Sequence, residues 1–231
     1  MSGTPALELL RVAKLYGHTA ALKATSLRLE VGETLALLGP NGSGKTTLLK
    51  IVAGVIAPTL GRGSVLGLDL EQDRRELRAA IGFLAAESYL YEDLTAEENL
   101  RFVLTMAGRR PDEPAVRAML GRVGLVAQAR ERTRSFSSGM KRRLALARVL
   151  VLQPRLLLLD EPYTNLDAEG ADLIDEAVRQ AVAGEGSVVL ATHDAERALA
   201  LADSVAALER GVVRYAGSVA GYRMLGAQHV G

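Results

Sequence analysis

The sequence predicts an α/β fold with a mostly parallel sheet, an antiparallel β subdomain at the N-terminus and an inserted helical subdomain. Three observations support this prediction. Short apolar runs are followed by segments with helical spacing, as in parallel sheets whose strands are connected by helices. Residues 6–38 alternate apolar segments with turns, and residues 96–152 have mostly helical periodicity.

The first 86 residues predict mainly strands. Segments 7–17 and 26–33 have the short apolar pattern of strands separated by turns, and the run TLALL at 34–38 is typical of a buried strand. The spacing then changes, so that KTTLLKIVAGV at 45–55 predicts a helix. GSVLGLDL at 63–70 predicts an extended segment, and IGFLA at 81–85 predicts a short buried strand.

Helices dominate the next part of the chain, with Gly and Pro between them, and strands then return. The predicted elements are helices at 96–108, 113–124 and 138–151, a strand at 155–160, a helix at 168–182, a strand at 187–192, a helix at 194–202 and a hairpin at 204–217. We therefore expect one domain over residues 1–231. In it, residues 1–86 and 151–231 form the α/β core, and residues 87–150 form the helical subdomain.

Composition narrows the range of partners. The 231 residues carry 28 Lys and Arg against 27 Asp and Glu, a net charge of +1, so nothing in the charge favours nucleic acid or an anionic membrane. The sequence has no cysteine, which excludes disulfides and thiolate metal sites and fits a reducing compartment. We expect no signal peptide and no membrane span, so any membrane association would depend on a partner.

The stretch GPNGSGKT at 39–46 fits the pattern G-x-x-x-x-G-K-[ST] between a predicted strand and a predicted helix. Its glycines let successive backbone N–H groups face a phosphate chain. We expect Lys45 to contact the β and γ phosphates and the Thr46 hydroxyl to ligate magnesium. The alternative is a glycine-rich turn that fits by chance, and both flanking elements argue against it. The predicted phosphate-binding residues are Gly39, Pro40, Asn41, Gly42, Ser43, Gly44, Lys45, Thr46 and Thr47.

Two adjacent acids end the apolar strand in RLLLLDEP at 155–162. Ligands collect at the carboxyl edge of a parallel sheet, and side chains alternate along a strand, so Asp160 and Glu161 are expected to point differently. Asp160 suits a magnesium ion, and Glu161 suits a base that polarises a water attacking the γ-phosphate. Considered alone, the pair would be a strand end followed by helix-capping acids; the phosphate loop in the same chain favours the site.

Two further residues have a functional and a structural interpretation. His193 directly follows the strand 187–192, where it would reach a γ-phosphate on the same edge of the sheet, although a lone histidine is usually structural or solvated. We interpret it as functional and, with Glu161 and Lys45, as catalytic. Tyr16 in KLYG is either an ordinary core or rim aromatic residue or a stacking surface for a purine, and both interpretations stay open.

A serine-rich segment, SFSSGMKRR at 135–143, precedes a basic helix. Bare amides at a helix N-terminus favour an anion. Without further information the segment is a serine-capped helix start with basic residues on a solvated face.

Taken in order, Tyr16, GPNGSGKT, FSSGM, LLLLDEP, TNLD at 164–167 and ATHD at 191–194 resemble the ATP-binding subunits of ABC transporters over most of the chain. The resemblance implies an ATP hydrolase that uses ATP and Mg²⁺ and forms a head-to-tail dimer with a second copy of itself. It also implies transmembrane permease partners, and a peripheral location at the cytoplasmic face of the inner membrane. The signature residues Ser137, Ser138, Gly139 and Met140 would face the partner's γ-phosphate, and Asp167 would lie at the dimer interface beside the catalytic water.

Two departures from the family pattern stand out. The signature usually has two glycines and a final glutamine, where this chain has Ser138 and Met140. The loop after strand 81–85 usually carries a glutamine that touches magnesium and senses the permease, and by spacing that position is Ala86, followed by Glu87. Either Glu87 takes over this contact through a shifted loop or the contact is dispensed with.

The segments 81–102, 136–150 and 156–167 are similar to the ATPase of the haem exporter of bacterial cytochrome c maturation. The alternatives are the ATPase of a drug, lipid or polysaccharide exporter, a non-transport ABC ATPase, and a nucleotide-binding regulator without turnover. The absence of a long coiled coil, zinc-binding cysteines and a second cassette argues against the non-transport class. Glu161 and His193 argue against the regulator. The cargo does not touch this subunit, so the sequence does not specify it.

Overall fold

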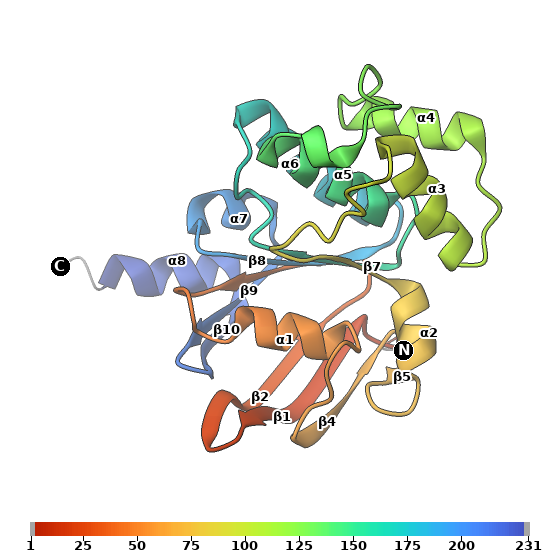
Figure 1. Cartoon of the computed structure of the whole chain (residues 1–231). Coiled ribbons are helices and arrows are strands. Elements are labelled where there is room, and N and C mark those ends of the chain that lie inside the picture. Colours follow the sequence, from red (N-terminus) through yellow and green to blue (C-terminus); the bar gives the residue numbers. More distant parts are fainter. Residues whose placement is uncertain (1–2, 229–231) are drawn as a thin grey trace.

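The centre of the molecule is a six-stranded sheet in the order β10-β9-β3-β8-β7-β6, shown by a computed structural model that describes residues 3–228 (Figure 1). All neighbouring strands are parallel except β10, which is antiparallel to β9. The strands are β3 (Thr34–Leu38), β6 (Ile81–Leu84), β7 (Leu156–Asp160), β8 (Ser187–Thr192), β9 (Ser204–Glu209) and β10 (Val212–Ser218). The mostly parallel sheet of the prediction is confirmed, and residues 1–2 and 229–231 of the predicted domain lie outside the described part.

A second, four-stranded sheet in the order β2-β1-β4-β5 is antiparallel throughout, which confirms the predicted N-terminal subdomain. Its strands are β1 (Leu7–Tyr16), β2 (Thr19–Leu29), β4 (Leu60–Val65) and β5 (Leu68–Asp69). The single extended segment expected at 63–70 is wrong. It is a tight hairpin, because Leu66 (φ 53°) and Gly67 (φ 82°) both take the left-handed backbone of a two-residue turn.

Each face of the central sheet is covered (Figure 1). Helix α1 (Lys45–Val52) and the antiparallel sheet pack on one face, through Leu37 and Leu158 among others. Helices α5 (Ser138–Leu150), α6 (Ala168–Ala183) and α7 (Ala195–Leu201) pack on the other, through Leu38 and Leu159. A fully buried leucine stabilises the fold by about 1.5–3 kcal/mol, which explains why these two-sided strands are continuously apolar.

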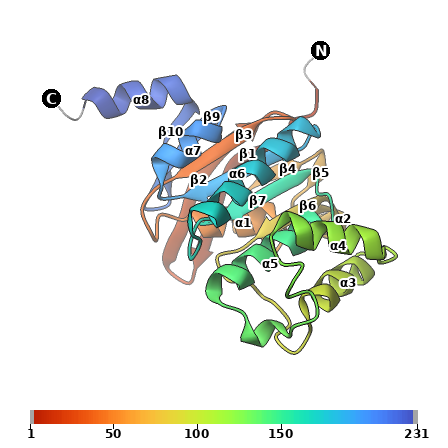
Figure 2. The same ribbon diagram turned by 90° about the horizontal axis from the view of Figure 1, so that it is seen from above.

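A separate apolar cluster holds the helical subdomain together. It is formed by α3 (Ala96–Met106), α4 (Glu113–Arg122), Phe136 after a 3₁₀ turn (Thr133–Ser135), and Leu144 and Ala147 of α5. Thr95 and Glu98 form a reciprocal cap at the start of α3, so this helix begins where the sequence predicts. Seen from above, α3 and α4 lie beyond β6, on the side of the sheet opposite to α8 (Val219–Gln228) (Figure 2). The division of the domain at residues 86 and 151 stays a prediction.

Two helices are absent from the sequence prediction, α2 (Arg74–Ala80) and α8 (Val219–Gln228). Leu77 is the one buried residue of α2, so this helix has no apolar stripe to reveal it. No helix in residues 3–228 is both long and apolar enough to cross a membrane.

Candidate nucleotide-binding and catalytic site

The phosphate loop connects β3 to α1, as the sequence predicts. A Cβ atom on Gly39 (φ 151°) would lie 2.2 Å from the carbonyl oxygen of Leu208, and one on Gly44 (φ 109°) would lie 2.7 Å from that of Ala21. Both positions therefore admit only glycine. The amide of Gly211 donates to the carbonyl of Ser43 at 2.8 Å, which ties the loop to the hairpin β9–β10.

A pocket of about 180 Å³ lies against this loop. It is lined by Ala21, Asn41, Gly42, Ser43, Gly44, Lys45, Thr46, Thr47 and Glu161. The N-terminus of α1 opens onto it, so free amides and the positive end of the helix dipole meet in one place, which suits a phosphate chain. The loop residues 41–47 and Glu161 thus line one pocket.

The Lys45 side chain is 5% exposed and reaches across the pocket. Its Nζ donates to the carbonyl of Gly39 at 2.6 Å and lies 3.1 Å from Oε1 of Glu161. Burial acts to raise the pKa of Glu161, but hydrogen bonds from Lys45 and His193 outweigh it and lower this pKa below its ordinary value. The carboxylate is therefore ionised at neutral pH, as a base requires.

Glu161 stands at a break in the backbone and not on a continuing strand. Its φ is 45°, the left-handed conformation that non-glycine residues rarely adopt. This break, and not strand alternation as the sequence predicts, accounts for its direction relative to Asp160. Its Oε2 accepts from the Thr192 hydroxyl at 3.2 Å and lies 2.8 Å from Nδ1 of His193. The His193 side chain is 64% exposed, so a ring held through Nδ1 presents Nε2 to a ligand.

Asp160 is completely buried, and neither of its carboxylate oxygens accepts a hydrogen bond with good geometry within residues 3–228. Burial raises its pKa, and the neighbouring Thr46 hydroxyl partly opposes this rise. A buried carboxylate with free oxygens beside a threonine hydroxyl is the donor set that suits Mg²⁺ bound together with a phosphate. The described residues hold no cluster of three or more metal-binding side chains.

The signature residues lie at the start of α5, away from this pocket's lining. Ser137 caps α5, its hydroxyl oxygen accepting from the amide of Met140 at 3.2 Å. A Cβ on Gly139 would lie 3.2 Å from the carbonyl oxygen of Asn165 in the same chain. Ser138 is the first residue of α5. That these residues face a partner's phosphate stays a prediction.

Two other predicted residues lie outside the pocket lining. Asp167 caps α6, its Oδ1 accepting from the amide of Gly170 at 2.8 Å. Tyr16 ends β1 and is 53% exposed, with the Lys14 Nζ 5.4 Å from its ring centroid. Ala21 of the neighbouring strand β2 lines the pocket, and Tyr16 does not. A stacking role for Tyr16 therefore stays a prediction.

Ala86 and Glu87 are both exposed in the loop after β6. A hydrogen bond from the Tyr89 hydroxyl to the Glu87 carboxylate raises the pKa of Tyr89. Glu87 therefore interacts with its own loop, and it is not among the residues that line the phosphate pocket.

Sequence reasoning missed Arg142. The basic residues of SFSSGMKRR were expected on a solvated face, and this is wrong for Arg142, which is 4% exposed. Helical spacing was the available signal, because Arg142 shares a face of α5 with the buried residues Ala145 and Leu146. Lys141 does lie at the surface, where its Nζ pairs with Glu92 at 2.6 Å.

A phosphate loop, a carboxylate pair and a histidine at one sheet edge, together with an inserted helical subdomain, define a P-loop nucleoside triphosphatase. The chain belongs to the ABC transporter family, whose conserved domain spans residues 22–164. It thus carries the ATP-binding and ATP-hydrolysing domain of that family.

Relatives include both exporters and importers. The chain is 36% identical over 208 residues to the Nod factor export ATP-binding protein I of Rhizobium etli, covering 89% of this chain and 66% of the relative. It is 37% identical to the daunorubicin resistance ATP-binding protein DrrA3 of Streptomyces coeruleorubidus (87% and 64% covered). It is 38% identical to the sulfate/thiosulfate import ATP-binding protein CysA of Bradyrhizobium diazoefficiens (92% and 63% covered). The chain thus spans about two thirds of the length of these relatives.

Solved structures that share the fold include two that cover most of this chain. One is the ATP-binding subunit of an ABC transporter, with TM-score 0.88, 28% identity and coverage of 97% of this chain and 94% of the other. The second is a dimeric ATP-binding cassette in a post-hydrolysis state with ADP and Pi, with TM-score 0.85, 28% identity and coverage of 92% and 98%.

Proposed function

We propose that this protein hydrolyses ATP to power export through a separate membrane subunit. The observation that carries the proposal is the chain of contacts Lys45–Glu161–His193 beside the phosphate loop. In this reading the loop amides and Lys45 hold the phosphates, Glu161 accepts a proton from the attacking water, and His193 binds the γ-phosphate through Nε2. Thr46 and Asp160 would hold Mg²⁺, which supplies charge neutralisation at the phosphates.

We further propose that two copies close head to tail over ATP, with residues 137–140 of each facing the other's γ-phosphate. The start of α5 offers a serine hydroxyl and helix amides for such a contact. The dimeric state of one related cassette supports this arrangement. The protein would sit at the cytoplasmic face of the inner membrane through its permease partners.

For the cargo we propose haem, because the segments 81–102, 136–150 and 156–167 resemble the haem exporter ATPase of cytochrome c maturation. Export of a drug or a lipid-linked saccharide is the second candidate, favoured by the daunorubicin resistance and Nod factor relatives. The membrane protein that co-purifies with the chain distinguishes them. A haem-handling partner supports the first candidate, an unrelated permease removes it, and no membrane partner points to a non-transport ATPase.

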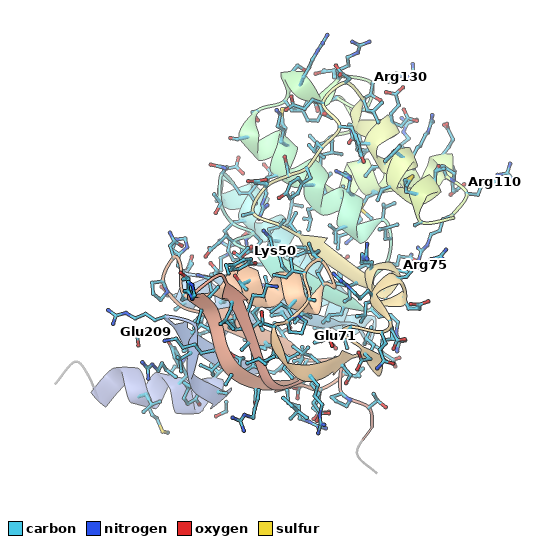
Figure 3. The ribbon with its side chains drawn as sticks, turned by 60° about the horizontal axis from the view of Figure 1, so that its bottom comes forward. Lys50, Glu71, Arg75, Arg110, Arg130 and Glu209 are labelled. Atoms are coloured by element: carbon cyan, nitrogen blue, oxygen red, sulfur yellow. The ribbon has the colours of Figure 1, made fainter. Side chains whose placement is uncertain are left out.

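Two substitutions test the hydrolysis itself. Glu161→Gln keeps the side-chain shape but loses the proton acceptor, so we expect ATP binding to persist and phosphate release to fall about 100-fold or more. Lys45→Ala removes the ammonium placed against the phosphates, so we expect calorimetry to show loss of tight ATP binding. The matched control is Lys50→Ala, in the last turn of the same helix (Figure 3), which should leave the affinity unchanged. Wild-type protein that releases no phosphate, or Lys45→Ala that binds normally, would refute the proposal.

A further inference from the structure

The Arg142 guanidinium uses every one of its five N–H donors on backbone carbonyls. Its Nε donates to Pro162 at 3.1 Å, its Nη1 to Ala85 and to Ala86 (3.2 Å), and its Nη2 to Asp160 (2.9 Å) and Glu161 (2.8 Å). These carbonyls come from two segments, the loop after β6 and the end of β7 with the turn that follows it. A single side chain of α5, the helix that begins at the signature residues and is called the signature helix below, therefore holds both segments in place.

This arginine is buried as a cation without a direct carboxylate partner in residues 3–228. Burial lowers the pKa of Arg142 to about 10, while the nearby charges of Asp160 and Glu161 act in the opposite direction. A buried charge costs free energy that only well-formed hydrogen bonds offset. A leucine or methionine would fill the same space without the cost of burying a charge. The specific contribution of the guanidinium is therefore its hydrogen bonds to the backbone carbonyls.

The contact at Glu161 bears on catalysis. Glu161 has the left-handed φ of 45°, which a non-glycine residue keeps only when its surroundings hold it. Its amide donates to the carbonyl of Ala191 at 2.8 Å, and its carbonyl accepts from Nη2 of Arg142. The backbone on both sides of the Glu161 side chain is thus fixed, and this fixes the direction of the carboxylate.

We propose that Arg142 is a positioning residue for ATP hydrolysis, holding the turn 160–162 and the loop 85–86 to the signature helix as one unit. The inference rests on the proposed function. It also accounts for Ala86, because Arg142 holds the loop through the backbone carbonyl of residue 86. Every amino acid has this group, whatever its side chain. The connection between the loop 85–86 and the turn 160–162 therefore needs no glutamine side chain at position 86.

The test compares Arg142→Ala and Arg142→Lys with wild type in ATP affinity and in kcat. Lysine keeps the buried cation but has at most three donors for five carbonyls. Because the phosphate loop is untouched, we expect ATP affinity within about threefold of wild type and kcat lowered about 10- to 100-fold, the usual effect of losing a residue that orients a metal ligand or a base. Circular dichroism confirms that each variant is folded.

Chemical rescue separates positioning from general damage. Free guanidinium ion, far below denaturing concentration, should restore part of kcat in Arg142→Ala, and ammonium at equal ionic strength should not. The matched control is Arg143→Ala, one residue further along α5, whose guanidinium lies against Gly124. It should keep wild-type kcat and show no response to guanidinium.

The outcomes are distinct. A folded Arg142→Lys with wild-type kcat overturns the proposal, as does an equal loss in Arg143→Ala. If Arg142→Ala does not fold, the kcat of Arg142→Lys decides alone. Phosphate release by the wild-type protein is measured first. A wild type that does not hydrolyse ATP refutes the proposed function and says nothing against the role of Arg142.

Discussion

Glu161 is one of several non-glycine residues with a positive φ, and it is the one that we propose as the catalytic base. A left-handed conformation costs a non-glycine residue roughly 1–2 kcal/mol. The contacts to Lys45, His193, Thr192 and Arg142 offset that cost. Removing any one of them should therefore affect catalysis before it affects the fold.

The lowered pKa of Glu161 gives a pH prediction. An acid whose pKa is lower in the folded protein stabilises the fold above its unfolded pKa of 4.5, and this stabilisation is lost as pH falls through the lowered folded value. We expect the difference in unfolding free energy between wild type and Glu161→Gln to be largest near neutral pH and to shrink as the pH falls below 4.5 and through the lowered folded value.

Urea unfolding at a series of pH values measures this difference. The charge of Glu161 also raises the pKa of the neighbouring Asp160, so the difference reports on Glu161 together with its effect on Asp160. A difference that stays constant from neutral pH to acid would contradict the lowered pKa.

At the scale of elements, one charged cluster connects α6, α7 and the loop after β7. The Arg197 Nη2 lies 2.6 Å from Asp172 and 2.8 Å from the buried carboxylate of Asp175. Asp175 also accepts from the Tyr163 hydroxyl at 2.9 Å. Because Tyr163 directly precedes the segment 164–167 and Arg197 lies one turn after His193, the cluster joins the two loops that flank Glu161.

We expect Arg197→Ala to lower the unfolding free energy by about 1–3 kcal/mol, since it leaves a buried carboxylate short of its cation. Arg179→Ala is the matched control, because Arg179 pairs with Glu176 at 3.8 Å on the exposed side of α6. It should change stability by less than about 0.5 kcal/mol. Urea unfolding checks both, and equal losses would contradict a special role for Arg197.

Elements with strong apolar patterns were predictable from the sequence, and those without were not. The strands β3, β7 and β8 are buried at every position, and α3 has an apolar stripe behind a capping box. By contrast α2 has a single buried residue. The hairpin β4–β5 was missed because it depends on the backbone of Leu66 and Gly67. Arg142 was missed because charge alone suggests solvent.

At the scale of the whole molecule, Gly139 tests the proposed dimer. In a Glu161→Gln background, which should accumulate ATP between two chains, Gly139→Asp would place a negative charge against the partner's γ-phosphate. We expect sedimentation to show no ATP-dependent dimer, while fluorescence titration shows unchanged ATP affinity of the monomer.

Gly139→Ala is the necessary control, because any Cβ here lies 3.2 Å from the Asn165 carbonyl of the same chain. Alanine makes that contact without the charge, so it should still dimerise. Equal loss in both variants would assign the effect to the chain's own loop. A dimer that persists in Gly139→Asp would refute the head-to-tail arrangement.

The order of strands in the central sheet also constrains how the chain folds during synthesis. β3 is made early, yet both of its neighbours, β8 and β9, lie roughly 150 residues or more further on. Until the ribosome has passed them, the apolar strand that precedes the phosphate loop has no hydrogen-bonding partner in this sheet. We therefore expect the nucleotide site to be among the last parts to form, so a nascent chain must keep this apolar strand from aggregating in the meantime.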